Sequence, residues 1–173
     1  MPSQDEEREH YGTHQNNPTD SGYRAFLCRL WEPLSKRLSY DAAGLDYGSG
    51  PGPTLHLIAQ ESGFECTHYD PFFHPDTAAL EKRYDFITCS ETAEHFHKPA
   101  VEFKRLYSLL KPDGLLGIMT SMRNENNDFA SWHYRYDPTH VAFYSKRCFE
   151  FIGEQFKFNS VDFPARNVVI LKR

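Results

Sequence analysis

The 173-residue sequence has no long apolar run, no leader-like start and no excess of basic residues. A membrane-spanning helix needs about 18 or more consecutive apolar residues, and no stretch approaches that length. The opening residues, MPSQDEEREHYG, lack the basic and then apolar regions of a signal peptide. We therefore expect a protein with no membrane partner and a cytoplasmic location.

Paired cysteines are also missing. The four cysteines are Cys28, Cys66, Cys89 and Cys148, and no two of them form a CxxC pair. This spacing is typical neither of a zinc ribbon nor of a small disulfide framework. The cysteines therefore indicate a reducing compartment.

The charge of the chain is concentrated near its start. The formal net charge is −5, and residues 1–20 hold five acidic residues and one basic residue, a net of −4. The remainder is close to neutral, which argues against a surface that neutralises phosphates and makes a nucleic-acid partner unlikely. We expect a polar arm at 1–20 and a single domain at 21–173.

Apolar periodicity predicts an alternation of helices and strands. Helices are expected at 23–38, with a kink or break at Pro33, and at 53–63, 76–83, 99–110 and 145–156. Strands are expected at 43–47, 64–69, 84–90, 115–121, 156–163 and 167–173. Gly114 is expected to end the helix before it, and Pro164 to lie in the connection of a C-terminal hairpin. The pattern predicts an α/β fold with a mostly parallel, doubly wound sheet and an antiparallel C-terminal hairpin.

Three alternating glycines follow the first expected strand. In the segment LDYGSGPGP, Gly48, Gly50 and Gly52 leave a backbone that a ligand can approach closely, although a tight turn without a ligand has the same sequence. Asp46 precedes the glycines, and Asp70 ends the next strand, where an acid can accept the hydroxyls of a ribose. The spacing is not the GxGxxG of dinucleotide-binding proteins, which disfavours an oxidoreductase. An adenosine that carries a sulfonium and an α-amino acid would suit both carboxylates.

Four segments in order resemble the motifs of class I S-adenosylmethionine-dependent methyltransferases: LDYGSGPG, YDPFF, YDFITCSETAEHF and LLKPDGLLGIMTS. In detail the chain is similar to small bacterial methyltransferases that carry a DPTHV-F-S segment. The resemblance implies a Rossmann-like fold, S-adenosyl-L-methionine as cofactor, and in-line methyl transfer to an acceptor, for which we expect a small molecule. Only fourteen residues separate Asp70 from Asp85, so we expect the third strand of the family to be shortened or absent.

The resemblance also implies roles for individual residues. Gly48, Gly50 and Gly52 would line the methionine moiety, and Asp46 would organise the loop around its amino group. Asp70 would hold the ribose. The remaining implied contacts are Pro71 and Phe72 beside the adenine, and Ser90 and Glu91 beside the transferring methyl group.

A general base is needed only if the acceptor must lose a proton. His140 is the first candidate and His95 the second, although His95 can equally pack or cap its turn. If that turn is helical, Glu91 and His95 share one face and the carboxylate can orient the imidazole. No third ligand stands at a convincing interval from His95 and His97, so we expect no metal.

Two further features leave alternatives open. The aromatic side chains of residues 122–144 can wall an apolar acceptor pocket, or form the small core of a lid, which suits Trp132 and Phe143. Tyr11, His14, Tyr23 and Arg24 can fold over the cofactor, and Arg24 can meet the methionine carboxylate or remain a solvated charge. A non-catalytic module that keeps the cofactor pocket, as a regulator or partner subunit, is the alternative to an enzyme.

Overall fold

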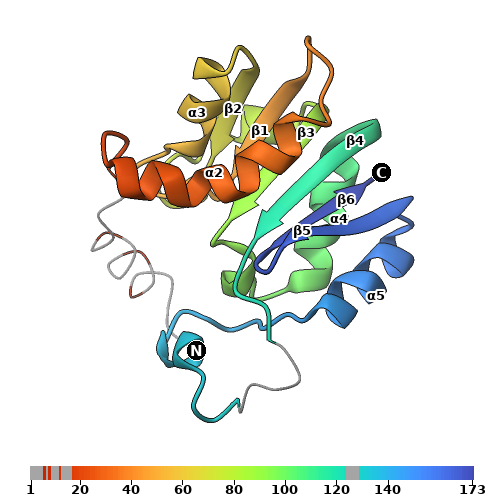
Figure 1. Cartoon of the computed structure of the whole chain (residues 1–173). Helices are drawn as coiled ribbons and strands as arrows, with labels where there is room; N and C mark the ends of the chain where they lie inside the picture. Colours follow the sequence, from red (N-terminus) through yellow and green to blue (C-terminus); the bar gives the residue numbers. More distant parts are fainter. Residues whose placement is uncertain (1–5, 7, 9–11, 13–16, 124–128) are drawn as a thin grey trace.

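The computed structural model describes residues 6, 8, 12, 17–123 and 129–173. Its centre is a six-stranded sheet in the order β2-β1-β3-β4-β6-β5 (Figure 1). The strands are β1 (Ala43–Tyr47), β2 (Glu65–Tyr69), β3 (Tyr84–Ser90), β4 (Leu110–Met119), β5 (Ser160–Ala165) and β6 (Val168–Lys172). The first four are parallel, and β6 runs antiparallel to both β4 and β5. The predicted Rossmann-like sheet with its C-terminal hairpin is therefore confirmed.

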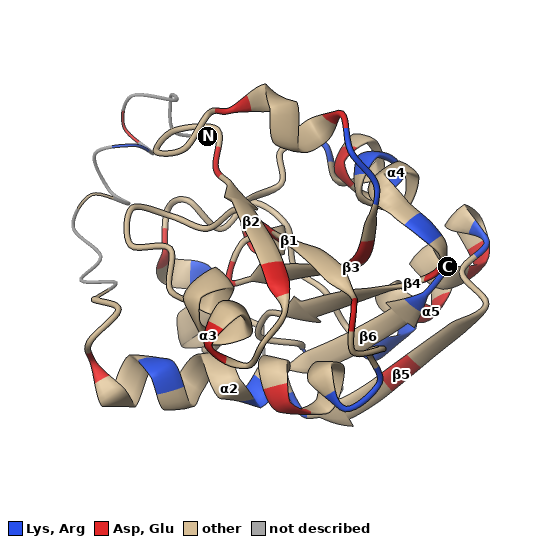
Figure 2. Cartoon of the chain, turned by 90° about the horizontal axis from the view of Figure 1, so that it is seen from above, with Lys and Arg blue, Asp and Glu red and all other residues tan. Residues whose placement is uncertain are grey.

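Helices cover both faces of the sheet (Figure 2). One face carries α2 (Ser21–Ser35) and α3 (Leu55–Glu61), and the other carries α4 (Pro99–Leu109) and α5 (Lys146–Phe156). The 3-10 helices are η1 (Thr77–Leu80), η2 (Ala93–His95) and η3 (His133–Tyr136). Each layer of helices buries its own apolar cluster against the sheet, as expected for a doubly wound fold.

The amphipathic stripe of α2 explains how this helix packs. Leu30 and Leu34 are fully buried, and they lie so close to β4 that a Cβ on Gly117 would come within 2.9 Å of Leu30. Pro33 lies inside the helix, which continues to Ser35. The helix is therefore not broken at Pro33, and it ends at Ser35, before the predicted end at residue 38.

The third strand of the family is absent from this sheet. Between β2 and β3 the chain forms only η1, whose first turn is capped by Asp76 through a 3.0 Å bond from the Ala78 amide. The short separation between Asp70 and Asp85 predicted this loss. The sheet edge at β2 is consequently the edge nearest to the expected cofactor site.

Two expectations about chain breakers were wrong. Helix α4 ends at Leu109 and β4 begins at the next residue, so Gly114 lies inside the strand and the left-handed residue is Asp113, with φ of 63°. Pro164 lies within β5, where the register with β6 shifts, instead of in the connection. Because β5 is an edge strand, a residue without an N–H is tolerated there.

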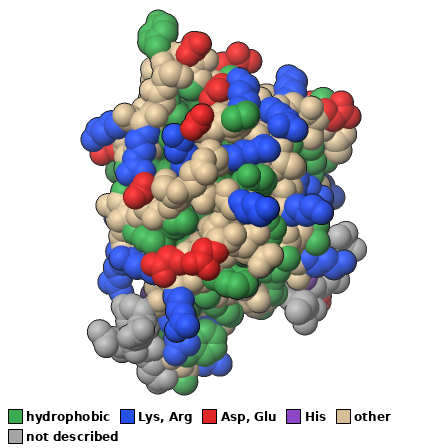
Figure 3. All heavy atoms as spheres, turned by 90° about the vertical axis from the view of Figure 1, so that its right-hand side faces the viewer, with side chains coloured by type: hydrophobic (Ala, Val, Ile, Leu, Met, Phe, Trp, Pro, Cys, Tyr) green, Lys and Arg blue, Asp and Glu red, His purple; other side chains and the backbone are tan. Residues whose placement is uncertain are grey.

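The carboxyl ends of the parallel strands face the segment 129–145, which crosses that end of the sheet (Figure 1). Arg123, which follows β4, is tied to the end of this segment, because its amide donates to the Tyr144 carbonyl at 2.8 Å. The face on the β5 and α5 side mixes basic, acidic and apolar side chains (Figure 3). No helix in the described ranges combines the length and apolar character that crossing a bilayer requires.

Candidate functional site

A cavity of about 900 Å³ opens at the carboxyl ends of β1, β2 and β3. Ligand pockets in α/β sheets occur at this edge, and the volume lies within their usual range. Most of the residues predicted from the sequence line it: Asp46, Gly48, Gly50, Asp70, Pro71, Phe72, Ser90, Glu91, His95 and His140. Gly52 is not among the lining residues, and its carbonyl instead accepts a 3.0 Å bond from the Thr54 hydroxyl.

The glycine turn is held against the end of β2. The amides of Gly48 and Ser49 both donate to the Tyr69 carbonyl, at 2.8 and 3.2 Å. Gly48 and Gly50 have φ of 75° and 67°, which L-residues with a side chain adopt only at a cost. A Cβ on Gly48 would lie 2.1 Å from Thr92 Cγ2, so this position also demands glycine for space.

Asp70 links the glycine turn to the segment that follows β2. Its Oδ2 accepts from the Gly50 amide at 2.9 Å, and its Oδ1 accepts from Phe72 and Phe73 at 2.8 and 3.1 Å. A carboxylate offers about four acceptor positions, so three bonds leave one on Oδ2. Asp70 therefore shapes the cavity wall and can still accept from a ligand.

Asp46 is the most deeply buried acid at the glycine turn, with only 3% of its surface exposed. Burial raises its pKa to about 7, against the opposing effect of a 2.9 Å bond from the Thr88 hydroxyl. Tyr23 of α2 lines the same cavity, and its own pKa is raised to about 12 by burial and by the charge of Asp46. A cationic group in the cavity would stabilise the ionised form of Asp46.

Two buried hydroxyls in the cavity wall fit a polar cofactor. Ser49 Oγ and Ser90 Oγ have no hydrogen-bond partner among the described residues, although both are shielded from solvent. Buried hydroxyls are nearly always hydrogen-bonded, so these positions suit a ligand with donors and acceptors along its length. The cavity residues therefore fit S-adenosyl-L-methionine, with its ribose and amino-acid groups.

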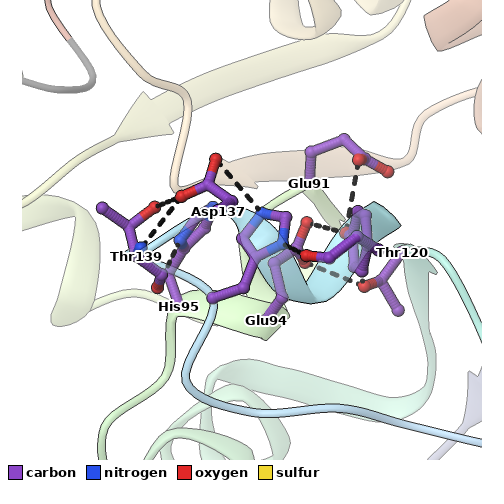
Figure 4. A network of polar contacts seen from close by, with 8 residues as sticks. Glu91, Glu94, His95, Thr120, Asp137 and Thr139 are labelled. Atoms are coloured by element: carbon purple, nitrogen blue, oxygen red, sulfur yellow. Dashed lines mark hydrogen bonds and ion pairs between the residues drawn. The ribbon is translucent and has the colours of Figure 1, made fainter. Parts of the chain in front are cut away.

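A network of acids lies at the β3 and β4 end of the cavity (Figure 4). Glu94 is completely buried and accepts from the Tyr134 hydroxyl and, at 2.9 Å, from the Thr120 hydroxyl. The same Tyr134 oxygen is 3.4 Å from Glu91 Oε2. Burial and the charge of Glu94 raise the pKa of Glu91 to about 8, and burial also raises the pKa of Glu94. The two carboxyls are thus connected through one phenol.

The two candidate bases lie together, and their tautomers follow from their partners. His140 Nδ1 is 2.6 Å from the Tyr134 carbonyl, and His95 Nδ1 is 3.0 Å from the Thr139 carbonyl. A carbonyl only accepts, so each Nδ1 carries a hydrogen and each neutral ring keeps its lone pair on Nε2. His140 Nε2 is 3.9 Å from Asp137 Oδ2, which would stabilise a protonated imidazole. We expected the Glu91 carboxylate to orient the His95 ring, whereas the partner of His95 Nδ1 is the Thr139 carbonyl.

The same cluster has the composition of a metal site. Ligand atoms of Glu94, His95 and His140 lie within 4.8 Å of one another. The sequence offered no third ligand near His95, because His140 is brought there from a loop far along the chain. The two readings of His140, as a base and as a ligand, differ in their response to a chelator.

The aromatic loop packs on itself. Trp132 is buried and its ring centroid lies 5.7 Å from that of Phe143 and 6.2 Å from that of Phe129. None of these three aromatic residues lines the cavity. The prediction of an aromatic wall around the acceptor was therefore wrong, and the alternative, a small aromatic core within the segment, is what the structure shows. The segment 129–145, which we call the lid, contributes Asp137 and His140 to the cavity instead.

The predictions for the N-terminal residues have different outcomes. Tyr11 and His14 lie outside the described residues, whereas Tyr23 lines the cavity. Arg24 forms an ion pair with Glu61 and donates to the Pro18 carbonyl at 3.2 Å. This pairing favours a structural role for Arg24 over contact with a methionine carboxylate.

Sequence reasoning assigned no site role to Tyr134, Thr120 or Asp137. Glu94 was readable from the sequence, since it lies in the segment ETAEHFH and forms with His95 the pair that the family resemblance places close to the active site. Tyr134 and Thr120 had no such signal, because they reach Glu94 from the lid and from the end of β4. Asp137 became recognisable only through its distance to His140.

Comparisons with known proteins concern the family and the fold. The family described as "Methyltransferase domain" matches residues 20–162. The chain is 30% identical over 89 residues to the ubiquinone biosynthesis O-methyltransferase of Proteus mirabilis, covering 51% of this chain and 36% of that protein. For the Serratia proteamaculans enzyme of the same name, the identity is 35% over 81 residues, covering 47% and 34%. The chain thus spans about a third of the length of these relatives.

Solved structures share the fold. A SAM-dependent methyltransferase from Archaeoglobus fulgidus superposes with a TM-score of 0.64 and 18% identity, covering 87% of this chain and 94% of that one. The Haemonchus contortus phosphoethanolamine N-methyltransferase 2, in complex with S-adenosyl-L-methionine, gives a TM-score of 0.60 and 15% identity, covering 80% and 37%. At these identities the likeness concerns the arrangement of strands and helices.

Proposed function

This chain belongs to the methyltransferase domain family, and we propose that it transfers the methyl group of S-adenosyl-L-methionine to a small-molecule acceptor. The observation that carries the proposal is the glycine turn itself. Its backbone is tied by Gly50 to Asp70 and opens onto a cavity that also contains the buried carboxylate of Asp46. This combination suits a long, polar and positively charged ligand.

The chain would hold the cofactor along the strand ends. Asp70 would take the ribose with its remaining acceptor position, and Phe72 would flank the adenine. Asp46 and Ser49 would serve the amino-acid end, and Ser90 the end that carries the methyl group. S-adenosyl-L-methionine, when bound, supplies a methyl group activated by a positively charged sulfur.

Alignment supplies much of the rate in a displacement of this kind. Effective molarities of about 10⁵–10⁸ M are reached when reacting groups are held in line. The lid segment carrying Asp137 and His140 closes the acceptor end and limits the access of water. Nε2 of His140 is the proton acceptor for the nucleophile, with Asp137 stabilising the charged ring, and His95 is the second candidate.

The non-catalytic alternative is not favoured. A module that only bound the cofactor would not need ionisable side chains at the methyl end of the cavity. Here Glu91, His95 and His140 all line that end, and the matched family and relatives are methyltransferases.

Calorimetric titration with S-adenosylhomocysteine tests the central proposal. We expect micromolar binding by the wild type and a loss of at least tenfold in Asp70→Ala, because a carboxylate that accepts both backbone and ligand donors is removed. Wild-type protein that fails to bind at millimolar concentrations would refute the assignment.

The base is tested by a pair of lid variants in a turnover assay over a panel of hydroxyl and amine acceptors. His140→Gln is expected to lower kcat by about 10²–10⁴-fold with S-adenosylhomocysteine affinity retained. His133→Gln, an exposed histidine of the same lid, serves as the matched control and is expected to match the wild type. Loss of turnover in EDTA with recovery on adding a divalent cation would instead make His140 a metal ligand.

A further inference from the structure

We propose that the acceptor carries a protonated amine and that Glu91 recognises this positive charge. This inference rests on the proposed function, because it names the class of molecule that occupies the acceptor end of the same cavity. Its basis is the position of Glu91, the shortage of cations around it and the backbone conformation that holds it in place.

The strand order determines where the acceptor lies. The cofactor contacts, Asp70 and the glycine turn, are on β2 and β1, and Ser90 follows on β3 in the next position of the sheet. The acceptor must therefore approach from the β3 and β4 end, under the lid. The ionisable side chains that line the cavity between the end of β3 and the start of α4, or from the lid, are Glu91, Glu94, His95, His97, Lys98, Asp137 and His140.

The basic side chains of the cavity come from α4 and from the residue before it. Among the described residues, the lysines and arginines that line it are Lys98, which precedes α4, and Arg105 within the helix. Arg105 Nη1 donates to the Tyr47 hydroxyl at 3.0 Å and pairs with Glu102 at 2.9 Å, which holds it at the end of β1. Within the described ranges, no lysine or arginine forms an ion pair with Glu91 or Glu94.

Glu91 can accept more hydrogen bonds from a ligand than Glu94 can. Glu94 is already bonded by two hydroxyls, whereas the one side-chain contact of Glu91 in the described part of the chain is the Tyr134 oxygen at 3.4 Å. Glu91 also has φ of 46°, a left-handed conformation that is unfavourable for a glutamate. Backbone strain of this kind is found at functional sites, and here it holds Glu91 in the cavity wall, within the polar network of Figure 4.

The charges of the site favour a cation in this place. Burial first, and then the charge of Glu94, raise the pKa of Glu91, and the two carboxyls, joined through Tyr134, repel each other when both are ionised. A bound ammonium removes the repulsion, whereas a carboxylate or phosphate would add to it. None of the described lid aromatics lines the cavity, so they do not form an apolar wall at this end.

The chemistry balances with an amine. The ammonium loses one proton to Nε2 of His140, which leaves a neutral amine with its lone pair. That lone pair forms the N–C bond while the S–C bond breaks and its electron pair stays on sulfur. The positive charge passes from the sulfonium to the methylated nitrogen, beside Glu91, and the coproduct is neutral at sulfur.

Three probes of one size test the inference: dopamine, 4-ethylcatechol and 3,4-dihydroxyphenylacetate, which carry an ammonium, a neutral and a carboxylate tail on the same catechol. Each is titrated calorimetrically into protein saturated with S-adenosylhomocysteine. We expect dopamine to bind about tenfold or more tighter than the neutral probe, and the carboxylate to bind most weakly. In Glu91→Gln this order should collapse to within about threefold, whereas Glu150→Gln, an exposed glutamate of α5, should keep it.

The outcomes separate this inference from the proposed function. Protein that binds S-adenosylhomocysteine but binds the three probes equally, prefers the neutral catechol or binds none would overturn the amine acceptor alone. An unchanged preference in Glu91→Gln would also overturn it. Glu91→Gly, which suits the left-handed conformation, replaces the glutamine variant if that variant does not fold, and S-adenosylhomocysteine affinity confirms folding in each case.

Discussion

Replacing Gly48 by alanine tests whether the glycine turn is built for close approach. Gly63 offers a matched comparison, because both glycines have positive φ, 75° and 89°, and differ in their surroundings. A Cβ at Gly63 meets nothing within 4 Å, whereas at Gly48 it would lie 2.1 Å from Thr92 Cγ2 and 2.6 Å from its hydroxyl. The pair therefore separates the conformational cost from the cost of crowding.

The magnitudes follow from these contacts. Gly63→Ala should lower the free energy of unfolding by about 1–2 kcal/mol, the cost of a left-handed L-residue. Gly48→Ala carries the same cost and adds about 1–3 kcal/mol, because Thr92 must move. The Thr92 hydroxyl donates to the Gly48 carbonyl at 3.0 Å and is close to the Ser90 carbonyl at 2.9 Å, so its displacement also disturbs the cavity wall.

Urea denaturation and calorimetry with S-adenosylhomocysteine measure the two effects. Gly48→Ala is expected to lose at least tenfold in affinity, and Gly63→Ala, which lies after α3 and away from the cavity, is expected to bind as the wild type does. Equal losses of stability in the two variants, or unchanged affinity in Gly48→Ala, would refute the reasoning from close approach.

Three further predictions concern other parts of the site. Asp70→Asn should cost about 1.5–3 kcal/mol of stability and weaken S-adenosylhomocysteine binding, since an amide cannot accept all three backbone N–H groups; Asp76→Asn, at the cap of η1, should leave binding unchanged in the same calorimetry. The pKa of His56 is lowered from 6.5 to about 4 by burial and by His68, so the folded state resists its protonation. Neutral His56 therefore costs no stability above pH 6.5, and the free energy of unfolding falls by up to about 3 kcal/mol as the pH is lowered toward 4. Urea denaturation at pH 7 and pH 4 should show a smaller fall in the free energy of unfolding for His56→Gln than for the wild type, and an equal fall would contradict this. Trp132→Ala should lower turnover but leave cofactor affinity within about twofold, because the lid core is lost while the glycine turn is untouched; a large loss of affinity would contradict that separation.

Local signals determined much of the fold. The three-and-four-residue stripe of α2, the strand between Ala43 and Tyr47 and the cap at Ser145 were readable because each depends on residues adjacent in the chain. The glycine turn and Asp70 were readable for the same reason, since a strand, a turn and the next strand lie within 28 residues, 43–70. The missing third strand followed from simple length.

The errors came from competition between local and distant interactions. Gly114 was expected to end a helix, but pairing with β3 draws Leu110 into β4 and leaves Asp113 as the left-handed residue. Pro164 was expected in a turn, but an edge strand with a shifted register accommodates it. In both cases strand pairing outweighed the preference of the single residue.

By itself, then, the sequence determined the parallel sheet, the glycine turn and the acids at its two sides, because these are set by short-range pattern and connection length. Only the tertiary structure decided what lies at the β3 and β4 end of the cavity. Glu94, Thr120, Tyr134 and His140 meet there because β3, β4 and the lid converge, and Trp132 turns away into the lid core. Such contacts join residues that are distant in the chain, and burial of the whole assembly, more than any local preference, places them.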